Sequence, residues 1–225
     1  MAVFALLLFP GLTQLDLTAP YEVFCRAPGA QVHLAWKDRQ PVASEHGMVF
    51  QPSIPLTELE RVDVLCIPGG SGVNQLLTDA AVIAEIQRLA AGATYVTSVC
   101  TGALLLGAAG LLRGRRATTH WSATEFLPAF GAIPTPGRWV EDGGVITGGG
   151  VTAGLDFALH LLARLHGDDV VQAVQLAIEY DPAPPFAGGH PDHAPVALVQ
   201  AIRQRLIEAQ AKRAAQVTVA AARLA

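Results

Sequence analysis

Cys100 lies in a segment whose residue types suit a nucleophile. A strand-like run, residues 94–99, precedes it, and an alanine- and leucine-rich helical run, residues 103–112, follows it. A cysteine at such a strand-to-helix turn is the thiol counterpart of a nucleophile elbow, where a sharp bend lifts the side chain above the sheet. The N–H groups and positive dipole end of the following helix favour the nucleophilic thiolate. The pattern therefore predicts a reactive Cys100, and a buried structural cysteine is the alternative.

Asp16 is the acidic residue that the sequence places near this cysteine. It follows the first strand-like run, residues 2–9, and lies among apolar residues. In a doubly wound sheet the carboxyl ends of the central strands open on one crevice, so Asp16 and Cys100 are expected to face the same space. A carboxyl group there can move protons for the thiol. The alternative is a helix-capping or turn aspartate.

Two backbone N–H groups complete the predicted site. The glycine-rich segment 68–72 ends a strand but matches no phosphate-binding pattern. We expect the N–H groups of Gly70 and Thr101 to face one point above Cys100 and to form an oxyanion-hole-type site. An ordinary tight turn is the alternative. The hydroxyl of Thr101 can also donate to a carboxylate or to a bound intermediate.

Other residues give weaker signals. Cys25, in a predicted helix, and Cys66, in a predicted strand, are expected to be core thiols. His120 ends a predicted strand and either reaches the site or is a structural histidine. A long Pro/Gly-rich loop, residues 182–195, is expected to be functional, with residues 182–186 forming part of a pocket wall.

Composition excludes several classes of protein. The chain has 225 residues, of which 51% are hydrophobic and 15% charged, which supports a large buried core. Its net charge of −4 argues against nonspecific nucleic-acid binding. No apolar run approaches the roughly 18 residues that span a bilayer. Three widely spaced cysteines give neither a disulfide framework nor a zinc pattern, so a cytoplasmic protein without a metal is expected.

Strand-like and helical segments alternate along the chain. Alternation of this kind, with no linker, predicts a doubly wound, mostly parallel α/β sheet with helices on both faces, in a single domain covering residues 1–225. The predicted strands are 2–9, 31–36, 48–51, 62–67, 94–99, 116–120 and a hairpin across 139–147. Two predicted helices start after the capping residues Thr18 and Ser122 and end near residues 25 and 130. The other predicted helices cover residues 80–91, 103–112, 152–165, 168–180 and 197–225.

Several segments together resemble the DJ-1/PfpI superfamily. They are residues 9–11 with Asp16, 67–70, 98–102 around Cys100, and 117–121. Segments 149–154 and 180–186 make the chain most similar to the isonitrile hydratase branch of that superfamily, and the resemblance covers nearly the whole chain.

This resemblance implies a flavodoxin-like fold, a homodimer and a lyase that hydrates a small isonitrile to an N-substituted formamide without a cofactor. It implies Cys100 as the nucleophile, acting through a thioimidate, with Asp16 and Thr101 as its partners. Protease-like members carry histidine after the cysteine, so Thr101 argues against peptidase activity. A ligand- or redox-sensing protein without turnover and a glyoxalase-type enzyme remain the alternatives. The sequence leaves the isonitrile substituent open.

The C-terminal helix carries an apolar stripe. The stripe consists of Ala197, Leu198, Ala201, Ile202, Leu206 and Ala209, and residues 214–225 are also unusually apolar. The stripe packs either on the chain's own sheet or in a homodimer contact, and we expect the contact.

Overall fold

A computed structural model describes residues 2–224 of the chain. Seven strands pair into one sheet, and every neighbouring pair is parallel except the hairpin at one edge. In spatial order they are β10 (Trp139–Asp142), β11 (Val145–Gly148), β7 (Tyr95–Ser98), β6 (Val64–Ile67), β1 (Val3–Leu7), β2 (Gln31–Trp36) and β5 (Ile54–Pro55). The prediction of a mostly parallel, flavodoxin-like α/β sheet is confirmed.

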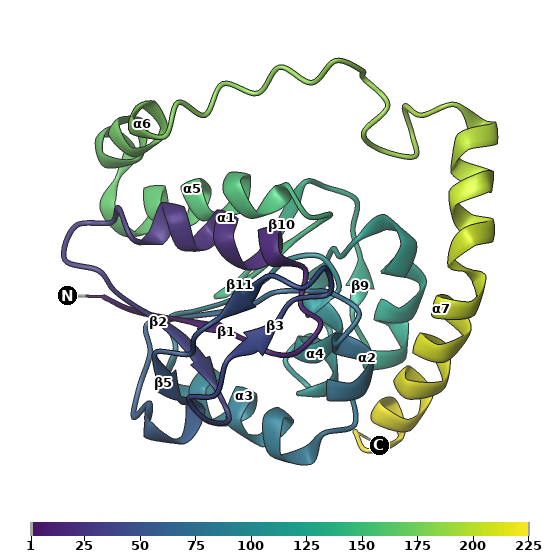
Figure 1. The fold of residues 1–225 in the computed structure, drawn as a ribbon, viewed down its shortest axis with the longest axis horizontal. Coiled ribbons are helices and arrows are strands. Elements are labelled where there is room, and N and C mark those ends of the chain that lie inside the picture. The colour runs from purple at the N-terminus through teal and green to yellow at the C-terminus, as the bar shows by residue number, and fades with distance from the viewer. Residues whose placement is uncertain (1, 225) are drawn as a thin grey trace.

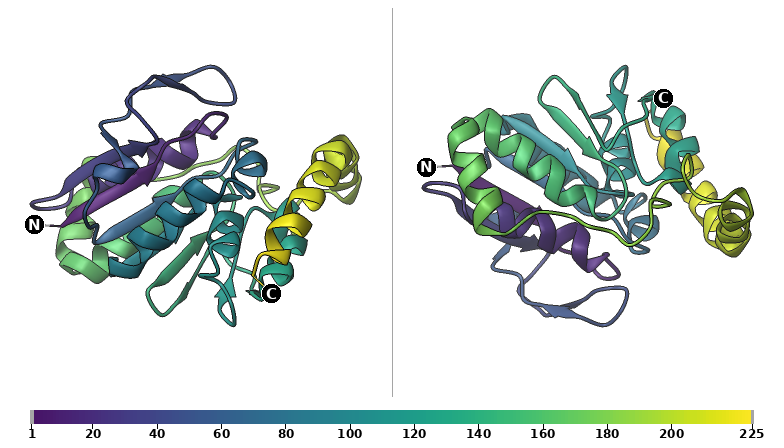
Figure 2. Two further views of the ribbon diagram at one scale, coloured as in Figure 1. Left: turned by 90° about the horizontal axis from the view of Figure 1, so that it is seen from below. Right: turned by 90° about the horizontal axis from the view of Figure 1, so that it is seen from above.

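Helices cover both faces of this sheet (Figures 1 and 2). One face carries α1 (Gln14–Phe24), α5 (Ala153–His166) and α6 (Asp168–Ala177), and the other carries α2 (Val73–Leu76), α3 (Ala80–Gly92) and α4 (Gly102–Ala108). The remaining elements are short: 3-10 helices η1 (Leu56–Glu58) and η2 (Trp121–Phe130), an antiparallel hairpin of β3 (Val42–Ala43) and β4 (Val49–Phe50), and a parallel pair of β8 (Arg116–Ala117) and β9 (Ile133–Pro134).

The core forms where β1 lies between β2 and β6. A strand covered on both faces must be apolar throughout, and each residue from Phe4 to Leu7 is at most 1% exposed. Phe4 stacks on Phe24 of α1 at 4.8 Å between ring centroids, and Phe24 meets Phe157 of α5 edge-on at 6.4 Å. This aromatic cluster fixes α1, which carries Asp16, against the sheet.

The first helix begins earlier than the sequence predicts. It starts at Gln14 rather than after Thr18, whose hydroxyl donates to Gln14 Oε1 inside the helix at 3.1 Å. The preceding loop is held because Thr13 N–H donates to Gly69 O at 2.9 Å, so the chain turns into the helix at once. Asp16 therefore lies in the first helical turn.

Two other local predictions have different outcomes. Asp79 caps α3, as predicted, by accepting from the N–H groups of Ala81 and Val82 at 3.1 Å. The helix predicted to be capped by Ser122 is instead a 3-10 helix capped by the ring of His120, which accepts from the Ser122 N–H.

The strand predicted at residues 116–120 is only two residues long and lies outside the main sheet. Residues 118–120 pair with no strand of the described chain, and two of them form hydrogen bonds with β11 and with the Cys100 backbone instead. Thr118 N–H donates to Thr147 Oγ1 at 2.9 Å, and the Thr119 hydroxyl donates to Cys100 O at 2.7 Å.

The last helix, α7 (Val196–Ala222), follows the long loop and packs on η2, α2 and α4 (Figure 1). The sequence predicts this helix over residues 197–225, whereas the observed helix ends at Ala222. Ala225, the last residue of the predicted range, lies outside the described part of the chain. Between residues 2 and 224, no helix combines the length and apolar character needed to cross a bilayer.

Candidate active site

Cys100 occupies a strained backbone position. Its φ is +53°, and within residues 2–224 only Glu179 is another non-glycine residue with a positive φ. Such strain persists where the surroundings fix it, and here they do so on both sides. The Cys100 N–H donates to Gly148 O at 3.1 Å and to Gly149 O at 2.8 Å, while its carbonyl accepts from Thr119. The backbone therefore has the geometry predicted for a nucleophile elbow.

The glycine after Thr101 lets α4 begin directly against strand β6. A Cβ atom at Gly102 would lie 2.2 Å from Ile67 O, closer than any side chain tolerates. This close approach brings the elbow beside residues 68–70, which follow β6 in the chain.

Asp16 is fully buried beside the elbow. Its Oδ2 atom accepts a hydrogen bond of 2.9 Å from the Gly69 N–H, and the carboxyl group interacts with the Cys100 thiol. Its Oδ1 atom is buried without a nitrogen or oxygen partner. Burial raises the pKa of Asp16 to about 7, although the Gly69 N–H and the Cys100 thiol act to lower it. The structure therefore brings the two predicted residues together.

The helix N-terminus was predicted to lower the pKa of the Cys100 thiol, but other effects raise it. Cys100 is only 7% exposed, and burial together with the neighbouring Asp16 carboxylate raises the pKa of its thiol. The N–H and hydroxyl of Thr101 act in the opposite direction but are outweighed. Because the two groups interact, they titrate as a pair. The pair therefore exchanges its first proton near neutrality, and the form with one proton and one negative charge becomes the main one as the pH rises above 7.

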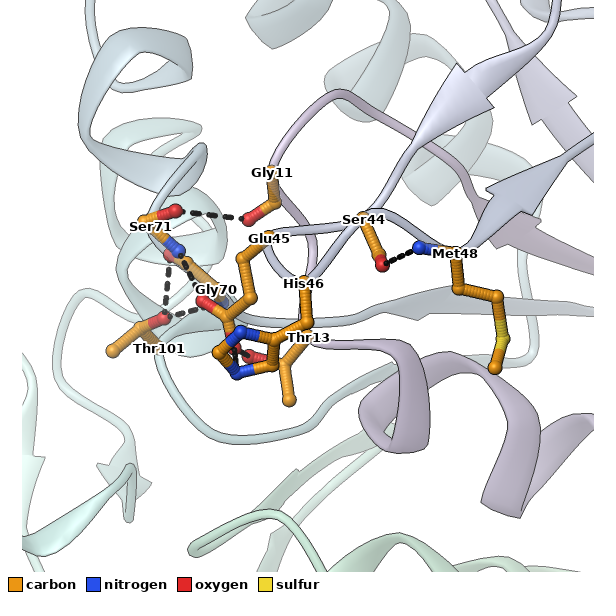
Figure 3. Close-up of polar contacts among 9 residues, drawn as sticks. All are labelled: Gly11, Thr13, Ser44, Glu45, His46, Met48, Gly70, Ser71 and Thr101. Atoms are coloured by element: carbon orange, nitrogen blue, oxygen red, sulfur yellow. Dashed lines mark hydrogen bonds and ion pairs between the residues drawn. The ribbon is translucent and has the colours of Figure 1, made fainter.

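Thr101 and Gly70 contact each other. Thr101 Oγ1 accepts from the Gly70 N–H at 3.1 Å and lies 3.4 Å from Gly70 O, to which it can donate (Figure 3). The Gly70 N–H predicted for an oxyanion hole therefore already has a partner. The Thr101 N–H is directed at the Cys100 thiol. Gly70 thus reaches the site through the Thr101 hydroxyl.

Gly69 is a site residue that the sequence did not single out. A Cβ atom there would lie 2.6 Å from Thr101 N, 2.7 Å from Thr101 Oγ1 and 2.8 Å from Asp16 Oδ2. Any side chain at this position would push apart the groups that surround the thiol. The signal available in the sequence is the pair of consecutive glycines, since a tight turn alone requires one.

Glu45 is a second site residue that the sequence pattern does not reveal. It follows β3, and its carboxylate accepts from the Thr13 hydroxyl at 2.7 Å and from the Ser71 N–H at 3.3 Å (Figure 3). It thereby joins the β3–β4 hairpin to the N-cap of α1, the helix that carries Asp16, and to the loop that carries Gly69. Its charge also acts to raise the pKa of Asp16. No motif marks Glu45, so only the fold identifies it.

Other predicted residues have structural positions. His120 Nδ1 lies 2.8 Å from Ser122 Oγ within the cap of η2, and burial lowers its pKa. Cys66 is a core thiol, as predicted, and burial raises its pKa to about 12. Cys25 is exposed rather than core: it is the C-cap residue of α1, and its side chain lies beside that of Tyr21.

The long loop does not line the site in this chain. Residues 182–186 are exposed, and the Phe186 side chain is 82% exposed, so the expected pocket wall is absent from the described structure. Across residues 2–224, no group of three His, Cys, Asp or Glu side chains is arranged to hold a metal ion.

Comparisons with known proteins bear on the family and the fold of the chain. Residues 3–164 match the DJ-1/PfpI family. The chain is 54% identical over 199 residues to the isonitrile hydratase of Pseudomonas putida, covering 88% of this chain and 87% of that protein. It is 31% identical over 150 residues to the HTH-type transcriptional regulator CdhR of Pseudomonas aeruginosa, of which it covers 44%. The crystal structure of a THiJ/PfpI family protein from Pseudomonas syringae superposes with a TM-score of 0.93 at 40% identity, covering 96% of this chain and 90% of that one.

Proposed function

The chain belongs to the DJ-1/PfpI family, and we propose that within this family it is an isonitrile hydratase, converting an isonitrile and water to an N-substituted formamide. The observation that carries this proposal is the 54% identity, over most of both chains, to the Pseudomonas putida enzyme of that name. The buried Asp16–Cys100 pair supplies what such a hydration needs, which is one nucleophile and one mobile proton.

In the first half of the proposed reaction, the Cys100 sulfur attacks the terminal carbon of R–N≡C. The proton held by the pair is delivered by Asp16 to that same carbon, giving an enzyme-bound thioimidate, R–N=CH–S. Asp16 is left as a carboxylate. Because its pKa is about 7, it is suited to give and to take up a proton near neutral pH.

In the second half, the Asp16 carboxylate removes a proton from water, whose oxygen attacks the thioimidate carbon. The same proton passes to the nitrogen. The C–S bond then breaks as the C=O bond forms, the hydroxyl proton returns to Asp16, and R–NH–CHO leaves. The pair regains one proton and one negative charge, and the sum is one isonitrile plus one water.

We propose that Thr101 donates hydrogen bonds to the Cys100 sulfur in both halves of the reaction. Its N–H and hydroxyl both act on the Cys100 thiol and favour its ionised form. The bond between Thr101 Oγ1 and the Gly70 N–H fixes the rotamer of the threonine. Thr101 thus stabilises the attacking and leaving sulfur, while Gly70 orients Thr101.

A sensing role is the second candidate, favoured by the 31% identity to a transcriptional regulator. A sensor would bind a ligand or become oxidised at Cys100 without releasing product. The two roles differ in turnover. The test is formamide production from an aryl isonitrile by the purified protein, with Cys100→Ala beside it and Cys25→Ser as the matched control at an exposed cysteine. Turnover of a glyoxal but not of the isonitrile would replace the proposal with a glyoxalase-type activity.

We further propose a homodimer in the cytoplasm, with α7 in the contact. On this helix Val196 is 72% exposed, Leu198 50% and Ile207 52%, an apolar surface that a second copy would cover. The three cysteines are free thiols, which agrees with a reducing compartment.

A further inference from the structure

Arg138 binds both ends of the segment that supports the elbow. Its carbonyl accepts from the Gly149 N–H at 2.9 Å, and its guanidinium donates to Thr152 Oγ1 at 2.9 Å. The Gly149 carbonyl in turn accepts from the Cys100 N–H at 2.8 Å. Residues 149–152 therefore lie between this arginine on one side and the strained backbone of the nucleophile on the other.

Asp156 and Tyr180 fix the orientation of the Arg138 guanidinium. Asp156 lies in the first turn of α5, where a negative charge is favourable, and its side chain is 19% exposed. Its Oδ2 atom accepts from Arg138 Nε at 2.5 Å, and its Oδ1 atom accepts from the Tyr180 hydroxyl at 2.7 Å. An isolated ion pair at a surface contributes little, but here each carboxylate oxygen has a partner. We call Arg138, Thr152, Asp156 and Tyr180 the Arg138 network.

The Arg138 network lies between two strained positions of the backbone. Within residues 2–224, Cys100 and Glu179 are the non-glycine residues with a positive φ. Glu179 directly precedes Tyr180, whose N–H donates to Gln175 O at 3.1 Å at the end of α6. Strain of this kind persists where the surrounding structure fixes it. The network therefore joins the end of α6, where the long segment to α7 begins, to the elbow (Figure 1).

The place of Arg138 at the edge of the sheet explains why its side chain matters. Arg138 directly precedes the edge strand β10, and its bond to Gly149 extends the β10–β11 ladder by one rung beyond the pair of Trp139 and Gly148. The end of an edge strand opens at a lower free energy than the core strands do. The guanidinium anchors this end to α5. Without that anchor, the Gly149 carbonyl and the Cys100 N–H are free to separate.

We propose that Arg138, held by Asp156, is a positioning residue that keeps residues 148–152 against the Cys100 N–H and so holds the thiol beside Asp16. It acts through the backbone of the elbow and is not a catalytic residue. The meaning of this role for catalysis rests on the proposed hydratase function. The placement of the thiol does not, because the reactivity of Cys100 toward an alkylating reagent can be measured without an isonitrile.

The first measurement is the rate of Cys100 alkylation by iodoacetamide at neutral pH, in a Cys25→Ser background that removes the exposed thiol. Arg138→Leu removes the guanidinium and keeps the carbonyl. It should speed alkylation by about threefold or more, because a thiol that moves away from Asp16 is more exposed and ionises more readily. Cys66 should stay unlabelled, since it is fully buried in β6.

Two outcomes of this measurement would overturn the proposal. One is an unchanged alkylation rate of Cys100 in Arg138→Leu, whatever happens to hydration. The other is equal acceleration at Cys66, which would mean that Arg138 stabilises the whole sheet and not the elbow.

The second measurement is isonitrile hydration, which should change in the opposite direction. In Arg138→Leu, kcat should fall by about 10-fold or more, because a small displacement of a reacting group has an effect of this size. Thr152→Val removes the hydroxyl that accepts from Arg138 and should give the same two changes to a smaller extent. The double variant should be no worse than Arg138→Leu alone, because both substitutions break one bond. Additive effects would contradict the network.

Arg39→Leu is the matched control. Arg39 forms the same kind of exposed ion pair, with Glu58 at 2.7 Å, and donates to Ser53 O beside β5 at the opposite edge of the sheet. This variant should leave both rates unchanged. Faster alkylation of Cys100 in Arg138→Leu but not in Arg39→Leu, in a protein that does not hydrate isonitriles, would refute the hydratase and leave the role of Arg138 intact.

Discussion

The Gly69 N–H donates a 2.9 Å hydrogen bond to Asp16 Oδ2, which joins the end of β6 to the first turn of α1. The same glycine lies against Thr101, so one residue without a side chain separates the proposed acid from the residue after the nucleophile. The carboxyl group can approach the thiol because this gap holds only backbone.

Gly69→Ala should therefore lower kcat/KM for isonitrile hydration by at least about 100-fold, since a misplaced catalytic group has an effect of this size. The added Cβ would lie 2.6 to 2.8 Å from atoms of Thr101 and Asp16, and one of them must move. Steady-state kinetics checks the loss. Gly92→Ala is the matched control, because a Cβ there meets nothing within 4 Å. Activity in Gly69→Ala equal to that control would show that the carboxyl group need not touch the elbow.

Asp16→Asn should reduce turnover by about 10²- to 10⁴-fold, the usual contribution of a general acid–base residue. The amide can still accept from the Gly69 N–H, so the fold should be retained, but it cannot give or take the proton. Asp16→Glu should be impaired and not dead, because it keeps the carboxyl group and moves it. The rate of formamide production at saturating isonitrile measures the turnover of both variants. Kinetics of Asp16→Asn close to those of the parent would remove Asp16 from the mechanism.

Asp16 also predicts how stability depends on pH. Its pKa is about 7 in the folded protein against 3.8 without the fold, so folding favours the protonated form. The contribution of Asp16 is complete below pH 4 and is lost as the pH rises through 7. At 1.36 kcal/mol for each pH unit, the loss is about 4 kcal/mol. Urea unfolding of the parent and of Asp16→Asn at pH 4 and pH 8 should show the difference between them shift by this order in favour of the variant. A difference that is constant with pH would contradict the raised pKa.

Strands and helix ends that depend on residues close together in the chain could be predicted from the sequence. Continuous apolar runs identified β1 and β6, and Asp79 marked the start of α3. The approach of Asp16 to Cys100 was also predictable, because it follows from strand order and not from side-chain detail. The start of α1 was not, since it depends on the bond from Thr13 N–H to Gly69 O, which exists only after β6 is in place.

What could not be predicted depends on contacts between distant segments. Glu45 is an ordinary charged residue in the sequence, and it gains a role only where the β3–β4 hairpin approaches the loop that carries Gly69. The thiol was expected to be ionised from the helix N-terminus beside it. The burial of Cys100 and the charge of Asp16 are tertiary effects, and they outweigh that local one.

The strain at Cys100 gives a prediction about stability. A left-handed conformation costs a residue with a Cβ roughly 1–2 kcal/mol, and glycine avoids this cost. Cys100→Gly should therefore be more stable than Cys100→Ala by about 1 kcal/mol, although both lack the nucleophile and should be inactive. Thermal unfolding of the two variants checks this. Equal or reversed stabilities would mean that the elbow relaxes when the thiol is removed.

The proposed dimer contact should lie in the first half of α7. In its second half Val217 and Ala220 are buried against the chain itself, and α7 there packs on α2 and α4. In its first half Leu198 and Ile207 are about half exposed and belong to no described core. A second copy covering them would remove apolar surface from water, and a closed two-fold dimer is the commonest way to do so.

Leu198→Glu combined with Ile207→Glu should therefore convert the dimer to a monomer, because each charge would be buried unpaired in the contact. Val219→Glu is the matched control, since Val219 is 49% exposed on the second half of the same helix. This variant should stay dimeric. Light scattering at micromolar concentration measures the mass of all three proteins. A parent protein that is monomeric would refute the dimer. Dissociation by Val219→Glu alone would move the contact to the second half of α7.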